Sequence, residues 1–142
     1  MREILFRGKR KDSGEWVEGL LWKKKYDTPK LFISCFPDKD DNEEVFVIYP
    51  ETVGQYTGLT DKNGTKIFEG DIVKETDIKH KGETQIKGKI YEIKMYKCAW
   101  IVKNHKGKFD YEKWDFLNTF APKVEVIGNI HDNPELLKGC EG

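Results

Sequence analysis

Cysteine is scarce in this chain of 142 residues, and its three copies, Cys35, Cys98 and Cys140, lie far apart. Their odd number and wide spacing provide neither a disulfide framework nor a Cys-x-x-Cys metal motif. Cys35 and Cys98 fall inside apolar runs, where a thiol behaves as a small hydrophobic group. These features predict a protein of a reducing cytoplasm.

Long apolar runs are also absent. No segment approaches the ~20 apolar residues that a membrane-spanning helix requires. The first residues, MREILFRGKRKDSG, carry charges on both sides of a short apolar stretch, which differs from the apolar centre of a signal peptide. We therefore expect no membrane association and a cytoplasmic location.

Patterns with metal-binding or nucleophilic chemistry are missing too. The histidines His80, His105 and His131 are isolated, and no two of them have the spacing of metal ligands. The segment 61–64 resembles the start of a calcium loop, but it lacks the later oxygen ligands and its glycine has the wrong offset. We predict no catalytic residue, no metal and no cofactor, and the sequence leans against an enzyme.

Two carboxylates, Glu69 and Asp71, flank Gly70 in the segment IFEGDIV. They alternate with apolar residues, so we expect both to leave the same face of a strand or bend. No histidine, lysine or metal-ligand set accompanies them in the sequence. The pair therefore gives little support to acid–base catalysis.

Charge is abundant, at 35% of residues, but its net value is zero and its sign alternates along the chain. Residues 1–37 carry +4, residues 38–77 carry −7, residues 79–108 carry +7 and residues 109–142 carry −4. Acidic and basic quarters can face each other within a chain or between subunits, and on this ground we expect a homo-oligomer. Solvated outer faces of strands produce the same pattern.

The basic quarter offers an alternative, a surface for nucleic acid. Lysines also neighbour aromatic residues, as at Trp22 beside Lys23 to Lys25, an arrangement that suits single-stranded nucleic acid through phosphate attraction and base stacking. Any strand with an aromatic inner face and a lysine outer face gives the same arrangement. The candidate contact residues, which we expect to be exposed to solvent, are Lys79, Lys81, Lys87, Lys89, Lys103, Lys106 and Lys108.

Apolar residues recur mainly with a period of two, which predicts a mainly β fold. In the segment 31–36, Leu31, Ile33 and Cys35 share one face and Phe32 and Phe36 share the other. A strand that is apolar on both faces is expected to be buried on both sides.

Other segments add strands, a turn and one or two short helices to this prediction. Residues 96–103 alternate like a strand, and Asn63-Gly64 predicts a tight turn with positive φ at Gly64. Apolar residues at 111, 114, 117 and 120 are compatible with a helix. A further helical turn is expected over 133–137, with Asn133 as its N-cap.

Three segments of the chain form a recognisable set: the opening REILFRGK followed by GEWVEG, the central TVGQYTGLTDKNGTKIFEGDIV, and VIGNIHDNPELL near the end. Together these segments resemble the phage- and prophage-encoded YopX family. Their order matches that of the family and together they span nearly the whole chain, whereas the stretch 74–123 matches no fixed pattern.

This resemblance implies a phage or prophage protein in the cytoplasm of a bacterial host. It also implies an SH3-like β-roll in the C-terminal part, so we expect an N-terminal β element over 1–50 and an SH3-like barrel over 51–142. The family supplies no catalytic residues to transfer. The leading prediction is a non-catalytic binding or assembly module with a phage or host protein partner, and the alternative is a nucleic-acid-binding protein that uses the segment 79–108.

Overall fold

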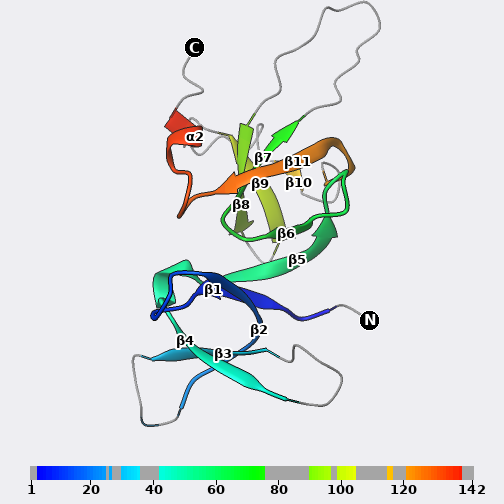
Figure 1. Ribbon diagram of the computed structural model, residues 1–142. Coiled ribbons are helices and arrows are strands. Elements are labelled where there is room, and N and C mark those ends of the chain that lie inside the picture. Colours follow the sequence, from blue (N-terminus) through cyan, green and yellow to red (C-terminus); the bar gives the residue numbers. More distant parts are fainter. Residues whose placement is uncertain are drawn as a thin grey trace, which may run out of the picture. The chain divides into compact units, whose positions relative to one another are not determined.

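The structure is a computed structural model, and it consists mainly of antiparallel strands (Figure 1). It describes residues 3–24, 26, 30–35, 42–75, 90–96, 99–104, 115–116 and 121–138, with the backbone alone at 96, 99, 101–104, 115–116 and 138. Two compact units divide the chain, Met1–Gly58 and Leu59–Gly142. The predicted mainly β fold is confirmed.

The first unit is an antiparallel sheet whose neighbouring strands follow the order β4-β3-β2-β1-β5. The bounds are β1 Phe6–Lys9, β2 Trp16–Trp22, β3 Leu31–Cys35, β4 Glu44–Ile48 and β5 Gly54–Thr60, with a short 3-10 helix, η1, over Pro50–Thr52. The sheet also closes on itself, because the Lys11 amide donates to the Val47 carbonyl and the Tyr49 amide to the Lys9 carbonyl, both at 2.9 Å. Strands β1 to β4 therefore form a small ring.

Two glycines make this closed sheet sterically possible. A Cβ atom at Gly8 would lie 2.7 Å from Cδ1 of Ile48, whose side chain is fully buried. A Cβ at Gly19 would lie 2.1 Å from the carbonyl oxygen of Ser34, so no larger residue fits between β2 and β3 there. Ile33 and Ile48, both with 0% exposure, fill the inside of the ring.

Strand β3 is buried on both sides, as the sequence predicts. Phe32, Ile33 and Ser34 are all buried, although Phe32 and Ser34 point to the side of the sheet opposite Ile33. The outer side of β3 is covered by Trp22, whose ring stacks on that of Phe32 with centroids 4.5 Å apart. The apolar residues on both faces of β3 are therefore buried in different ways: Ile33 lies inside the ring, and Trp22 of β2 covers Phe32 on the outer side.

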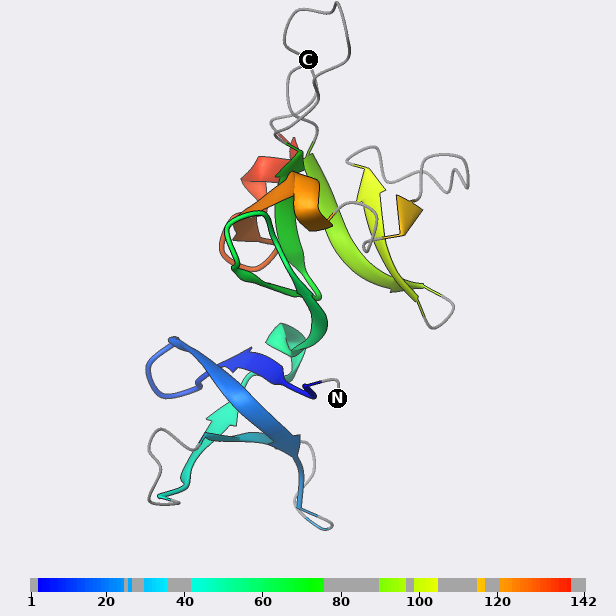
Figure 2. The same ribbon diagram turned by 90° about the vertical axis from the view of Figure 1, so that its right-hand side faces the viewer.

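The second unit contains a five-stranded antiparallel sheet in the order β10-β9-β8-β7-β11 (Figure 2). Its elements are β6 Lys66–Phe68, β7 Asp71–Glu75, β8 Ile90–Tyr96, β9 Ala99–Asn104, β10 Asp115–Phe116, the 3-10 helix η3 Ala121–Lys123, β11 Val124–Asn129 and α2 Glu135–Lys138. Its core is made of Ile67, Val73, Tyr91, Ile93, Ala121 and Val124.

The structure corrects two predictions made from alternation. The expected continuous strand over 96–103 is wrong, because Tyr96 ends β8 and lies opposite Ala99, the first residue of β9. The apolar alternation of the sequence runs on past the end of β8 and so does not mark where one strand ends and the next begins. The helix expected around 111–120 contains a strand instead, since Asp115 and Phe116 pair with Val102 and Ile101 of β9. The remainder of that segment lies outside the described residues.

Candidate binding surface

The central signature contains a buried carboxylate that organises the hairpin between β5 and β6. Asp61 is 5% exposed; its Oδ1 accepts the amides of Asn63 and Thr65 at 2.8 and 2.9 Å, and its Oδ2 accepts that of Val126 at 2.9 Å. Gly64 follows with φ of 83°, so the predicted turn with positive φ is confirmed. This carboxylate joins the turn to β11 and its role is structural.

The carboxylates beside Gly70 differ in their surroundings. Asp71 is 1% exposed and its Oδ2 accepts the Phe68 amide at 2.8 Å. Partial burial raises the pKa of Glu69, and the nearby Lys94 opposes that shift. Gly70 has φ of 88°, which turns the chain between β6 and β7. Asp71 thus stabilises this turn from within the second unit.

The C-terminal signature also serves the fold. A Cβ at Gly128 would lie 2.5 Å from Oδ1 of Asn133, and that oxygen accepts the Asn129 amide at 3.3 Å. The His131 amide donates to Oδ1 of Asn129 at 3.0 Å. Asn133 was expected to cap the last helix, but the hydrogen bond of its side chain runs back to the end of β11. The described signature residues of the second unit therefore shape its turns and strand ends.

Most of the predicted lysine surface lies outside the described residues. This applies to Lys79, Lys81, Lys87, Lys89, Lys106 and Lys108, and for Lys103 only the backbone position in β9 is described. Their grouping into one basic face stays a prediction.

The first unit presents a different surface on the outer side of β2, β3 and β4, which we call the outer sheet face. Strand pairing places Leu20, Ser34 and Val45 in one row across the three strands, and Trp22, Phe32 and Val47 in the next. Leu20 is 52% exposed and Val45 is 45% exposed. Two large, exposed apolar side chains thus lie on either side of the small, buried Ser34.

A hydrogen-bonded chain fixes the aromatic cover of this face. Nε1 of Trp22 donates to Oγ of Ser34 at 2.7 Å, and that hydroxyl donates to Oε1 of Glu43 at 2.6 Å. Nζ of Lys24 lies 5.7 Å from the centroid of the Phe32 ring. Because the indole is both stacked and hydrogen-bonded, the apolar rows have a defined shape before any partner arrives.

The outer sheet face carries charges of opposite sign at its two edges, which lie at the two ends of its strands. Glu18 precedes Leu20 on β2 and Glu43 precedes Val45 beside β4, so exposed carboxylates border one edge. Exposed Lys24 and Lys30 follow Trp22 and precede Phe32, so ammonium groups border the other. Each charged edge lies two residues beyond an apolar row. Along the strands the face therefore runs from an acidic edge, through the two apolar rows, to a basic edge.

Sequence reasoning missed this face. It identified the lysines beside Trp22, but the rows emerge only when the register of three strands is known. The sequence of β2 did contain a signal for this face, because both faces of the strand are largely apolar. One face carries Trp16, Glu18, Leu20 and Trp22, and the other carries Val17, Gly19 and Leu21.

Among the described residues, no group of three or more histidine, cysteine, aspartate or glutamate side chains is placed to hold a metal ion. Within the same residues, no helix is long and apolar enough to cross a membrane.

Comparison with known proteins defines the class first. The chain is similar to a solved structure, the protein EF1440 from Enterococcus faecalis, with 25% sequence identity and a TM-score of 0.55. The match covers 96% of this chain and 99% of the other, so the two share their mainly β fold over nearly their whole lengths. None of the curated proteins matches the chain.

The family follows from a second comparison. Residues 5–138 match the model of the YopX family, described as YopX protein. Because the match spans nearly the whole chain, this protein belongs to the YopX family.

Proposed function

We propose that this YopX-family chain is a non-catalytic assembly module of a phage or prophage, working in the cytoplasm of the bacterial host. Its function is to associate with a second copy of itself through the outer sheet face. The observation that carries the proposal is the exposed apolar row of Leu20 and Val45 between edges of opposite charge.

A second copy is the partner that this charge order favours. In a two-fold symmetric interface each residue of one patch meets the other copy of the same patch. A two-fold axis that lies in the plane of the interface and runs along the apolar rows places the acidic edge of one copy over the basic edge of the other. The apolar rows then meet in the middle, where association removes them from water, and the charged edges fix the register.

The chain as a whole is suited to this arrangement. Its 25 basic and 25 acidic residues cancel, so no long-range repulsion opposes association between copies. Trp22 is held in place by its stack and hydrogen bond, which lowers the entropy that an aromatic side chain loses in an interface.

Exchange of charges between the two edges tests the arrangement. Glu18→Lys places lysines on both edges, and Lys24→Glu places carboxylates on both, so each single variant is expected to associate more weakly than the natural chain. The double variant Glu18→Lys/Lys24→Glu restores opposite edges, and its self-association is expected to recover. Sedimentation velocity at low salt measures the three proteins.

Recovery in the double variant is specific to pairing between the edges. If the double variant associates no better than either single variant, the two-fold arrangement is wrong. Circular dichroism provides the control that all three variants are folded, which the exposure of Glu18 and Lys24 leads us to expect.

A further inference from the structure

A separate surface of the first unit combines cations and aromatic rings along β1. Nζ of Lys9 lies 5.4 Å from the centroid of the Trp16 ring, and Cζ of Arg7 lies 4.8 Å from the same ring. Nζ of Lys11 lies 6.0 Å from the ring centroid of Tyr49. We call these five residues the basic–aromatic strip.

Backbone pairing makes the strip continuous. Lys9 is directly opposite Trp16 of β2, and its carbonyl accepts the Tyr49 amide from the end of β4 at 2.9 Å. Arg7 and Lys9 alternate along β1, so they leave the same face of the strand, and Lys11 follows in the turn after β1. The strip therefore crosses from Trp16 over Lys9 to Tyr49.

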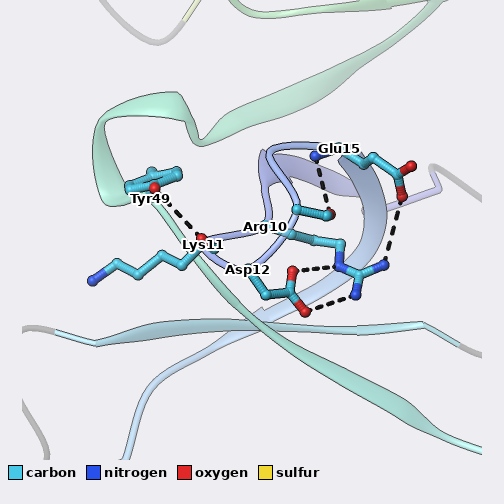
Figure 3. A network of polar contacts seen from close by, with 6 residues as sticks. Arg10, Lys11, Asp12, Glu15 and Tyr49 are labelled. Atoms are coloured by element: carbon cyan, nitrogen blue, oxygen red, sulfur yellow. Dashed lines mark hydrogen bonds and ion pairs between the residues drawn. The ribbon is translucent and has the colours of Figure 1, made fainter.

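In the turn between β1 and β2, next to the strip, the acidic residues pair with Arg10 (Figure 3). Nε and one terminal nitrogen of Arg10 donate to the carboxylate of Asp12 at 2.9 and 2.7 Å, and Glu15 lies 3.7 Å from the other terminal nitrogen. In Figure 3 the Lys11 side chain extends away from both carboxylates, on the side of Tyr49. The two carboxylates of the turn thus pair with Arg10, and the Lys11 ammonium lies away from them.

We propose that the basic–aromatic strip binds single-stranded nucleic acid. Phosphates are attracted to the ammonium groups of Lys9 and Lys11, and the ring of Tyr49, at 38% exposure, offers a surface on which a base stacks. A duplex keeps its bases stacked on one another and offers no such contact, so the strip selects single strands. This surface is distinct from Leu20 and Val45 and from the lysines of the segment 79–108.

Fluorescence anisotropy with labelled oligo-dT and a matched duplex, at ~50 and ~200 mM salt, tests the proposal, because phosphate binding weakens steeply with salt. The full-length chain is expected to bind the single strand more tightly than the duplex. Lys11→Ala is expected to weaken binding and to lower its salt dependence. Tyr49→Ala is expected to weaken binding roughly fivefold or more, whereas Tyr49→Phe retains the ring and binds like the natural chain.

Lys62→Ala is the charge-matched control, since Lys62 is an exposed lysine of the second unit, and it is expected to leave affinity unchanged. No binding at ~50 mM salt overturns the proposal, because electrostatic attraction is strongest there. Equal affinity for single strand and duplex contradicts the role of the rings. Binding that survives both Lys11→Ala and Tyr49→Ala unchanged places the contact elsewhere and rejects the strip.

Discussion

Asp61 is the residue on which the hairpin of the second unit depends. Its two carboxylate oxygens accept three backbone amides, two from the turn and one from β11. Backbone amides that are buried without an acceptor cost about 1–3 kcal/mol each. A side chain without oxygens at this position therefore leaves several donors without their acceptor at once.

Replacing Asp61 tests this role. Asp61→Ala is expected to lower the free energy of unfolding by about 2–4 kcal/mol, since three amides at partly buried hydrogen bonds lose their acceptor at once. Urea unfolding followed by fluorescence measures the change. Glu135→Ala, which removes an exposed carboxylate of the same unit, is the control and is expected to change stability little. Equal effects of the two substitutions contradict the structural role.

Arg10 and Asp12 give a second prediction at the scale of single residues. The hydrogen bonds from Arg10 hold the pKa of Asp12 below its ordinary value, and the charge of Arg10 adds to the shift. A carboxyl pKa that is lower in the folded chain means that this pair stabilises the fold above the ordinary carboxyl pKa. That contribution is lost as the pH falls through the folded value.

An NMR titration of the Asp12 carboxyl measures this shift directly. In the natural chain the pKa is expected below that of an unpaired aspartate, and in Arg10→Gln it is expected to rise toward the ordinary value. Arg10→Lys retains the charge but loses the bidentate hydrogen bond to the carboxylate, so the Asp12 pKa in this variant is expected to lie between those of the natural chain and Arg10→Gln. An Asp12 pKa that is the same in all three chains contradicts the pairing.

At the scale of elements, the contact between β2 and β3 depends on the absence of a side chain at Gly19. A Cβ there would lie 2.1 Å from a backbone oxygen, and backbone cannot move aside as a flexible side chain can. This contact fixes how closely β2 approaches β3, and through Trp22 it fixes the cover over Phe32.

Gly19→Ala is therefore expected to destabilise the first unit by more than about 3 kcal/mol, since the strands must separate to admit the methyl group. Hydrogen exchange of the amides of β2 and β3, together with urea unfolding, measures the effect. Glu18→Ala places the same methyl group at the adjacent, outward-facing position of the strand and is expected to retain the exchange protection. Protection that is equal in the two variants contradicts the close approach.

Sequence patterns predicted elements better than they predicted the surface. The two-sided burial of β3 and the turn at Gly64 were readable because each depends on local composition. The strand over 96–103 was placed wrongly because the period of two in the sequence runs on past the end of β8 at Tyr96, and alternation alone does not mark where a chain reverses. The outer sheet face was missed because its rows join residues from strands that only the pairing register aligns, such as Leu20 with Val45.

At the scale of the whole molecule, the central and C-terminal family segments and the apolar rows of the outer sheet face lie in different units. The signature residues Asp61, Gly70 and Gly128 shape turns and strand ends of the second unit. The exposed apolar rows belong to the first unit. Charge was predicted from sequence to favour association between copies, and the outer sheet face gives that prediction a specific location with an acidic and a basic edge.

The central claim, self-association through this face, is tested most directly by molar mass. Multi-angle light scattering at micromolar concentration and low salt is expected to give twice the monomer mass for the natural chain. Leu20→Asp, which places a charge in the apolar row, is expected to give the monomer mass. The control Ile4→Asp replaces another exposed apolar residue outside the row and is expected to remain dimeric. A strictly monomeric natural chain, or a dimer that Leu20→Asp leaves intact, contradicts the account.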